Sequence, residues 1–159
     1  MAKSEHVRLI KQGADLWNRE RQKDKGLTPD LTWISLGKAD LIGADLSSAN
    51  LRGAFLRGAL LSGADLSDAN LIGTNLNDAD LSACMLMGAN LTRANLIGTK
   101  LVKANLSNAI VTEADFGNAD LEGADLTNCK HLTLKQLKSA ATLAGAKIDS
   151  HLMVQIKEG

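Results

Sequence analysis

The sequence predicts an all-β solenoid, and two features of one long stretch carry that prediction. From Leu36 to Leu126 a Leu, replaced once by Val and once by Phe, recurs at every fifth residue over nineteen consecutive positions. Two residues before these centres, from Ala39 to Ala124, stand eighteen small residues, all of them Ala except Thr74, Cys84 and Thr99. Asp or Asn usually precedes the centre, and turn-forming residues follow it.

A period of five residues fits neither a straight helix nor a straight strand. In a helix, five steps of about 100° would carry successive Leu residues around the axis. In a strand, side chains alternate between faces, so every second Leu would point outward. A backbone that turns one corner per repeat returns every Leu to the inside, together with the small residue two positions before it. Because one such unit cannot bury its own apolar face, the units are expected to stack.

These A(D/N)LXX units resemble the pentapeptide-repeat family over residues 36–126. The resemblance implies a right-handed quadrilateral parallel β-helix with four repeats per coil and about five coils. At the usual strand spacing of about 4.8 Å, this makes a rod roughly 24 Å long. The sequence adds weak support for four sides, because Asn50, Asn70 and Asn90 recur at twenty-residue spacing. We place this β-helix at residues 30–131, within a chain expected to be one compact domain.

Residues 1–29 predict an α-helical cap and a linker. The apolar stripe Val7, Ile10, Ala14 and Trp17 indicates a helix over residues 4–22, with Ser4 as its N-cap. Its other side is basic, so it could lie on a membrane surface. The stripe is short and the first coil needs its open edge covered, which favours the capping role. Gly26 and Pro29 mark the linker, and Trp33 is expected to pack near the capping helix.

Residues 132–159 predict a C-terminal helical cap, because the repeat pattern fails at His131. Thr133 can cap a helix over residues 134–142 that ends before Gly145. Residues 149–157 form a second short helix or, because Leu152, Val154 and Ile156 alternate, a strand. This segment either closes the second open edge or offers a surface for self-association. A monomer and an end-to-end dimer both stay open.

Composition bounds the partners and the compartment. The 18 basic and 18 acidic residues balance to a net charge of zero, which gives no general attraction to nucleic acid or anionic membrane. No apolar run approaches the roughly 20 residues that span a bilayer, and the N-terminus has no signal core, so a cytoplasmic location is the default expectation. Cys84 and Cys129 should lie on different sides of the rod and about 10 Å apart along it, as two free buried thiols.

The sequence offers no pattern for catalysis, cofactor binding or metal binding. His6, His131 and His151 are dispersed, and no phosphate-binding loop, dinucleotide fingerprint or nucleophile elbow is present. The repeated Gly residues fit the turn position of the repeat and need no phosphate to explain them. Asn side chains in a column are expected to hydrogen-bond along it. We therefore predict a non-enzyme with no cofactor and no metal site.

Two groups of residues are candidate interaction surfaces. Four apolar residues are predicted to point outward, on adjacent sides of one coil and around Leu86: Phe55, Leu60, Met85 and Met87. Scattered exposed apolar residues are normal, and an interaction patch is the alternative. Five acids occur between residues 104 and 129 without a Lys or Arg: Glu113, Asp115, Asp120, Glu122 and Asp125. They form either a contact surface for a basic partner or a solvated face.

Two classes of function follow. The first is a non-catalytic, rigid scaffold that binds an unidentified protein partner. The second comes from the resemblance, which implies a possible DNA mimic that binds and protects DNA gyrase, a type II topoisomerase. That role needs a strongly negative rod, whereas residues 31–130 carry 11 acidic and 7 basic side chains. Direct nucleic-acid binding is expected still less, because a neutral chain attracts phosphate weakly.

Overall fold

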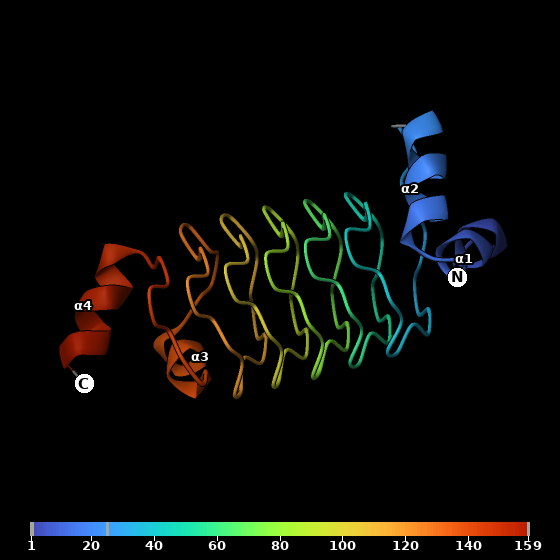
Figure 1. Cartoon of the computed structure of the whole chain (residues 1–159). Coiled ribbons are helices and arrows are strands. Elements are labelled where there is room, and N and C mark those ends of the chain that lie inside the picture. The colour runs from blue at the N-terminus through green and yellow to red at the C-terminus, as the bar shows by residue number, and fades with distance from the viewer. Residues whose placement is uncertain (1, 25, 159) are drawn as a thin grey trace.

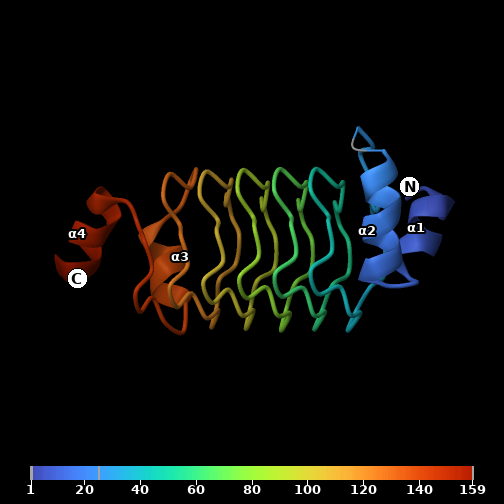
Figure 2. The ribbon, with the colours of Figure 1, turned by 45° about the horizontal axis from the view of Figure 1, so that its top comes forward.

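The computed structural model describes residues 2–24 and 26–158 as a rod with helices at both ends (Figures 1 and 2). Helices α1 (Ser4–Ile10) and α2 (Ala14–Lys23) lie at one end, and α3 (Leu134–Ser139) and α4 (Ser150–Glu158) at the other. The coils between them hold extended segments so short that each is a single parallel bridge. None of the four helices, which belong to the described part of the chain, is long and apolar enough to cross a membrane.

The bridges define a regular register. From Asp30↔Asn50 to Ile110↔Lys130, each bridge joins residues twenty positions apart. Each coil therefore has four five-residue sides, as the family resemblance implied. Two backbone hydrogen bonds accompany each bridge, as when the Leu51 N–H donates to the Asn70 carbonyl at 2.8 Å and the Asn70 N–H donates to the Ala49 carbonyl at 2.9 Å. The coils are thus joined along the whole rod by main-chain hydrogen bonds.

Every corner of the coil is a tight turn. The N–H of the small residue donates to the carbonyl of the centre three residues earlier, as from Ala64 to Leu61 at 2.9 Å. The residue just before the small one is left-handed, with φ between 54° at Ala83 and 70° at Gly88. This is the conformation that a type II turn requires at its third residue. The requirement explains why Gly recurs there, and why Asn and Asp are the frequent substitutes.

The interior holds the Leu centres and the small residues. Leu71, Leu81 and Ala89 are representative, each with no exposed surface. Polar residues in the small position are also buried, and each one finds a partner: Thr74 Oγ1 donates to the Leu51 carbonyl at 2.8 Å, and Cys84 Sγ donates to the Leu61 carbonyl at 2.8 Å. The inward direction predicted for both positions is therefore observed, and the buried polar atoms carry little desolvation penalty.

The N-terminal segment differs from its prediction in three respects. One helix over residues 4–22 was expected, but Gly13 with φ 104° separates α1 from α2. Ser4 is the first helical residue, and Lys3 stands at the N-cap without a side-chain hydrogen bond. Trp33 was expected to pack near the capping helix, but the residue is 61% exposed and its ring lies over Gly53 of the next coil.

Helix α2 instead uses other side chains to contact the edge of the first coil. Trp17 is buried, and its Nε1 donates to the Asp45 carbonyl at 2.6 Å. Asn18 accepts a hydrogen bond from the Asp45 N–H at 2.8 Å and donates one to the Gly43 carbonyl at 2.9 Å. Arg21 donates to the Ser47 carbonyl at 2.9 Å. Backbone groups that have no preceding coil to pair with thus gain partners from this helix.

The C-terminal segment also departs from a simple helical cap. Thr133 caps α3 in a capping box with Gln136, but the helix ends at Ser139 instead of extending to residue 142. The chain then returns to the solenoid, where Asp120 bridges Thr142 and Asp125 bridges Lys147. Their spacing is twenty-two residues, because α3 replaces one side of this coil. Residues 150–158, for which helix and strand were both open, form a helix.

Candidate functional site

The Asp or Asn before each centre has a structural role in the turn. Its side-chain oxygen accepts a hydrogen bond from the N–H two residues later, as from Ser67 to Asp65 at 2.9 Å and from Ile97 to Asn95 at 3.0 Å. These i to i+2 bonds correct the expectation that Asn side chains would bond along the column. The bond recurs at these positions: Asp30, Asp40, Asp45, Asn50, Asp65, Asn70, Asn75, Asp80, Asn90, Asn95, Asn105, Asp115, Asp120 and Asp125.

The same hydrogen bonds keep several of these carboxylates ionised. The hydroxyl of Thr127 has the largest effect and lowers the pKa of Asp125 below its ordinary value. Burial opposes it, and the Thr127 N–H and the Lys147 ammonium lower the pKa further. At Asp45, burial raises the pKa, but hydrogen bonds from Ser47 and the charge of Arg21 outweigh it and leave the pKa lowered. These carboxylates stabilise turns, and because their pKa values are lowered they are poor proton donors near neutral pH.

Four apolar residues stand where this Asp or Asn would be expected: Phe55, Leu60, Met85 and Ile110, of which Ile110 is half-buried and the other three are exposed. Phe55 is 50% exposed, Met85 is 45% exposed and Leu60 is 43% exposed. An apolar side chain cannot accept the hydrogen bond that stabilises the turn, so each position loses that contribution. Met87, two residues after Met85, is 47% exposed. The structure therefore confirms the outward direction predicted for all of these residues: Phe55, Leu60, Met85 and Met87.

The register shows how these residues are distributed over the rod. Phe55 lies in the column of Ser35 and Asn75, and Leu60 lies in the column of Asp80 on the next side of the same coil. Met85 belongs to a third column and to the following coil, above Asp65. The structure thus places the four side chains on three successive sides, with Met85 and Met87 in the same repeat, in a partial spiral around the rod rather than on one flat face.

Sequence reasoning missed a fifth member of this set. Trp33 occupies a left-handed turn position with φ 58°, and its ring covers the backbone of Gly53 in the next coil. Gly53 is two residues before Phe55, so Trp33 lies at the corner that leads into the side carrying Phe55. A signal was available in the sequence, since Trp33 and Gly53 are one coil apart and only Gly leaves room for the ring.

The five acids of the last complete coil do not form a single face. Their register distributes them over successive sides, with Asp115, Asp120 and Asp125 in three different columns. Glu113 Oε2 lies 2.7 Å from Arg93 Nε, and Asp125 Oδ2 lies 3.4 Å from Lys147 Nζ. The result is a ring of acids that is partly neutralised by neighbouring cations.

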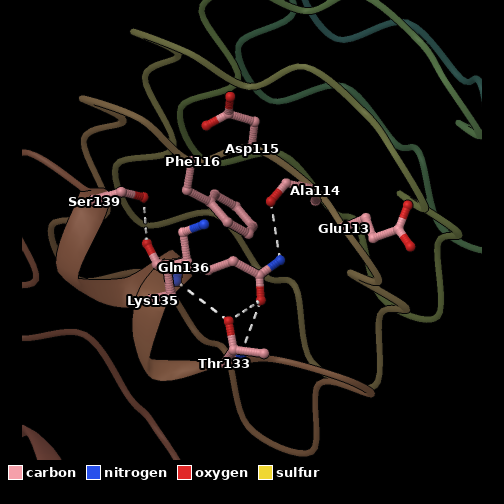
Figure 3. A pocket seen from close by; sticks show the side chains of 8 residues that line it. All are labelled: Glu113, Ala114, Asp115, Phe116, Thr133, Lys135, Gln136 and Ser139. Carbon is pink, nitrogen blue, oxygen red and sulfur yellow. Dashed lines mark hydrogen bonds between the residues drawn. The ribbon is translucent and has the colours of Figure 1, made fainter.

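An open pocket of about 480 Å³ lies where α3 leaves the solenoid (Figure 3). Gln136 extends across it and donates to the Val111 carbonyl at 2.7 Å and to the Ala114 carbonyl at 2.9 Å. Thr133 Oγ1 lies 2.8 Å from Gln136 Oε1, and Ser139 Oγ donates to the Gln136 carbonyl at 2.7 Å. The polar atoms in the pocket therefore stabilise the junction between helix and coil, and they include no pairing of a nucleophile with a base.

The remaining reactive side chains do not assemble a site either. Cys84 and Cys129 are free, and burial raises the pKa of each thiol to about 12. Cys129 is only half-buried, which corrects the expectation of two buried thiols. Within residues 2–24 and 26–158, no three His, Cys, Asp or Glu side chains lie close enough together to hold a metal ion.

One protein family and several solved structures match this chain. The family described as pentapeptide repeats matches residues 30–63, 64–101 and 89–128, with eight copies. The comparison with curated proteins finds no match. A solved pentapeptide repeat protein, Rfr23 from the cyanobacterium Cyanothece 51142, is 28% identical over 84% of this chain and 94% of its own, with a TM-score of 0.50.

Two further solved structures are similar. QnrB1, a plasmid-mediated fluoroquinolone resistance protein, is 22% identical over 84% of this chain and 74% of its own, with a TM-score of 0.49. A pentapeptide repeat protein of the Arabidopsis thaliana thylakoid lumen is 30% identical over 69% of this chain and 72% of its own, with a TM-score of 0.42. The family match alone spans more than half of the sequence. The chain therefore belongs to the pentapeptide repeat family, whose members fold as right-handed β-helices.

Proposed function

We propose that this protein is a non-catalytic, rigid scaffold that binds a protein partner through apolar side chains displayed on its coils. One observation carries the proposal. Phe55, Leu60 and Met85 occupy positions where Asp or Asn would add a hydrogen bond to the turn, and all three are more than 40% exposed. Apolar residues that lower local stability without filling the core are expected where a surface binds a partner.

The architecture suits a surface that must hold its shape. The main-chain ladder joins each coil to the next, and the side chains project from backbone positions repeated every five residues. We further propose that the helices at both ends act as caps, which keep the open edges from pairing with other chains. The contacts of Trp17, Asn18 and Arg21 with the first coil, and of Gln136 with the last, support that role.

A DNA mimic that binds gyrase is the poorer fit. Such a surface requires a long and continuous negative face. Here the five acids are spread around one coil, and Glu113 and Asp125 each have a cationic neighbour. Arg57 and Asp78 form a further exposed ion pair, with 3.3 Å between Nη2 and Oδ2. The charge of the rod is mixed along its length.

A substitution that separates binding from stability tests the proposal. In the triple variant Phe55→Asn, Leu60→Asn and Met85→Asn, each new side chain can accept the turn hydrogen bond, so the fold should become more stable. Purified wild-type and variant proteins are used as bait in extracts of the source cell, and captured proteins are quantified by mass spectrometry. The proposal predicts a partner that wild type captures directly and the variant captures much less.

The matched control is Lys100→Asn, which restores the same kind of turn at a position that is not apolar. It should gain stability and retain the partner. Equal capture by wild type and the triple variant would contradict the proposal. A gyrase supercoiling assay, with and without a quinolone, tests the alternative. If wild type protects gyrase and the variants Asp115→Asn and Asp120→Asn do not, the gyrase-binding alternative would be supported, with the acidic coil as the binding surface.

A further inference from the structure

We propose that the side of the rod that carries Phe55, with Trp33 at one of its corners and Arg57 at the other, binds an acidic, extended segment of the partner, in which carboxylates flank an apolar side chain. This inference rests on the proposed function and specifies the chemistry of the partner. Three independent features of the first two coils support it: a pair of exposed aromatic rings, a cluster of basic side chains and a hollow beside them.

The aromatic pair is held in place by the fold. The Trp33 N–H donates to the Arg52 carbonyl at 3.0 Å, which fixes Trp33 in register with the next coil. Its ring lies directly on Gly53, where any Cβ would overlap the ring atoms. Ser35, two residues after Trp33, pairs with Phe55 of the next coil. The chain that leaves the Trp33 turn therefore runs beside Phe55. Trp33 is 61% exposed and Phe55 is 50% exposed, so both rings are available to a partner without rearrangement.

Basic side chains lie at both corners of the side that carries Phe55. Arg52 immediately precedes Gly53, and Arg57 follows Phe55 by two residues. The Lys38 N–H donates to the Arg57 carbonyl at 2.9 Å, which places Lys38 one coil before Arg57, at the corner that follows the one with Trp33 and Arg52. The nearby carboxylates of Asp30 and Asp40 accept hydrogen bonds from their own turns, at Thr32 and Ile42. These two carboxylates belong to the columns on either side of the Phe55 column. The Phe55 side and its two corners, residues 32–38, 52–58 and 72–78, hold three cations against the one carboxylate of Asp78, so this side is locally positive although the whole chain is neutral.

An open hollow of about 500 Å³ adjoins this cluster and is lined by Gly37, Lys38, Arg57, Gly58 and Asp78. Two of its five lining residues are Gly, which has no side chain and so leaves room beside the backbone for another chain. Asp78 provides the only carboxylate among the lining residues, and its Oδ2 lies 3.3 Å from Arg57 Nη2. Both side chains are exposed, at 71% for Arg57 and 57% for Asp78, so their ion pair is weak. A carboxylate from the partner can take the place of Asp78 beside Arg57.

An acidic peptide fits these features better than a single-stranded nucleic acid. Nucleic-acid grooves carry a track of cations that follows the phosphates over several nucleotides. Here the cations are confined to the two corners of one side, and Arg57 already has one anionic neighbour. Two or three carboxylates of such a peptide can pair with the three cations, while its apolar side chain contacts the two aromatic rings.

A direct binding measurement tests the inference. The probe is a fluorescein-labelled peptide in which Asp alternates with Ser around one central Phe. Matched peptides carry Asn or Lys in place of Asp, and a labelled oligo-dT strand represents nucleic acid. Fluorescence anisotropy gives the affinities between about 50 and 300 mM salt. Trp33 provides a second signal, because the other Trp, Trp17, is buried and its emission should not change.

The acidic peptide should bind most tightly, weaken with salt and protect Trp33 from quenching by acrylamide. Arg57→Gln, Lys38→Gln and Trp33→Ala should each weaken binding by about threefold or more. Asp78→Asn should tighten binding, because it removes the competing carboxylate, and a gain of affinity cannot result from misfolding. Lys138→Gln removes an exposed cation from α3 at the other end of the rod and should leave the affinity unchanged.

Tighter binding of oligo-dT or of the Lys peptide would overturn the inference, and so would weaker binding by Asp78→Asn. Equal binding of the Asp and Asn peptides would show that the cations play no part, which also overturns it. None of these results bears on the capture experiment with the triple Asn variant. If that variant still loses its partner while the acidic peptide fails to bind, only the chemistry assigned to the partner is wrong.

Discussion

The left-handed turn residue is the most demanding single position in the repeat. It recurs once per corner, and Ala83 occupies it with φ 54°. A Cβ in this conformation meets the following carbonyl and costs about 1–2 kcal/mol. Gly avoids that cost, although it loses about 0.5–1 kcal/mol more conformational entropy on folding. The balance favours Gly at this position by a small margin.

We therefore predict that Ala83→Gly raises the free energy of unfolding by about 0.5–1 kcal/mol, as measured by urea denaturation. Ala64→Gly makes the same chemical change at a fully buried position, where the methyl group fills the interior. This control should lose about 1 kcal/mol or more. The explanation would be wrong if both substitutions changed the stability in the same direction.

The turn carboxylates predict how stability changes with pH. The pKa of Asp125 is lowered in the folded protein, chiefly by the Thr127 hydroxyl, from an ordinary value of 3.8. A folded-state pKa below the unfolded one contributes stability above the unfolded pKa, and that stability is lost as the pH falls through the folded value. Asp45 and Asp80 act in the same direction.

Asp125→Asn should consequently make the protein less sensitive to acid. Asn keeps an oxygen that accepts from Thr127 but does not titrate in this range. Urea denaturation at about pH 7 and about pH 3 should show a smaller loss of stability in the variant than in wild type. Thr127→Val, which removes the hydroxyl responsible for the lowered pKa, should also reduce the loss. An unchanged loss in both variants would exclude Asp125 as a contributor.

At the scale of elements, the sequence predicted the repeats more accurately than the ends. The Leu and Ala positions fix the direction of each side chain because the solenoid repeats one local geometry, and that geometry determines burial directly. At the N-terminus, the apolar stripe continues from Val7 to Trp17 across Gly13, so periodicity alone predicts one helix. The φ of 104° at Gly13 is open to Gly and strained for other residues, and it divides the stripe into α1 and α2.

The return of the chain to the solenoid was missed because its phase changes. Ala146, Lys147 and Ile148 follow the repeat pattern, and Gly145 occupies the left-handed turn position before them with φ 68°. Helix α3 shifts this unit by two residues from the phase of the preceding repeats. A search that holds the phase constant cannot find it.

The candidate surface was predictable only in part, for a similar reason. Phe55, Leu60, Met85 and Met87 depart from the repeat, so the pattern itself identified them. Trp33 lies outside the regular repeats, and its neighbour Phe55 is twenty-two residues away in the sequence. Their proximity depends on the length of a coil, which the sequence supports only weakly.

The contact of α2 with the first coil gives a prediction for a whole element. Arg21 is buried and donates to the Leu27 and Ser47 carbonyls, and its Nε lies 3.5 Å from Asp45 Oδ2. Arg21→Met keeps much of the apolar stem but removes every donor, so carbonyl groups at this edge lose their partners. We expect a loss of about 2 kcal/mol in urea denaturation, together with faster amide exchange in α2.

Arg19→Met serves as the matched control, because Arg19 lies on the same helix and is exposed. Its side chain forms no hydrogen bond or ion pair within the described chain. It should change the stability little. If α2 is a cap, light scattering should also detect association of Arg21→Met at concentrations where the Arg19 variant is monodisperse. Slow exchange throughout α2 in Arg21→Met would show that Arg21 does not anchor the helix.

At the scale of the whole molecule, the rod is a stack in which each coil contacts its neighbours. The bridges join residues twenty positions apart, so a coil is defined by twenty residues rather than by any one side chain. Stability in such a protein is approximately a sum over units and their interfaces. Added coils should therefore extend the rod without disturbing the ends, provided that they preserve the phase.

A duplication of residues 64–83 inserted after residue 83 tests this property. The inserted segment supplies four repeats, one complete coil, and restores every later residue to its original side. The variant should be longer by about 4.8 Å in small-angle X-ray scattering. Its urea denaturation should have a steeper dependence on denaturant, because more surface is buried, and a midpoint at or above that of wild type. A control of equal length carries Ser at the four inserted Leu positions and cannot bury a core, so it should loop out and lower the midpoint. A lower midpoint in the plain duplication would mean that stability depends on direct communication between the two helical ends, which a stack of nearest neighbours does not allow.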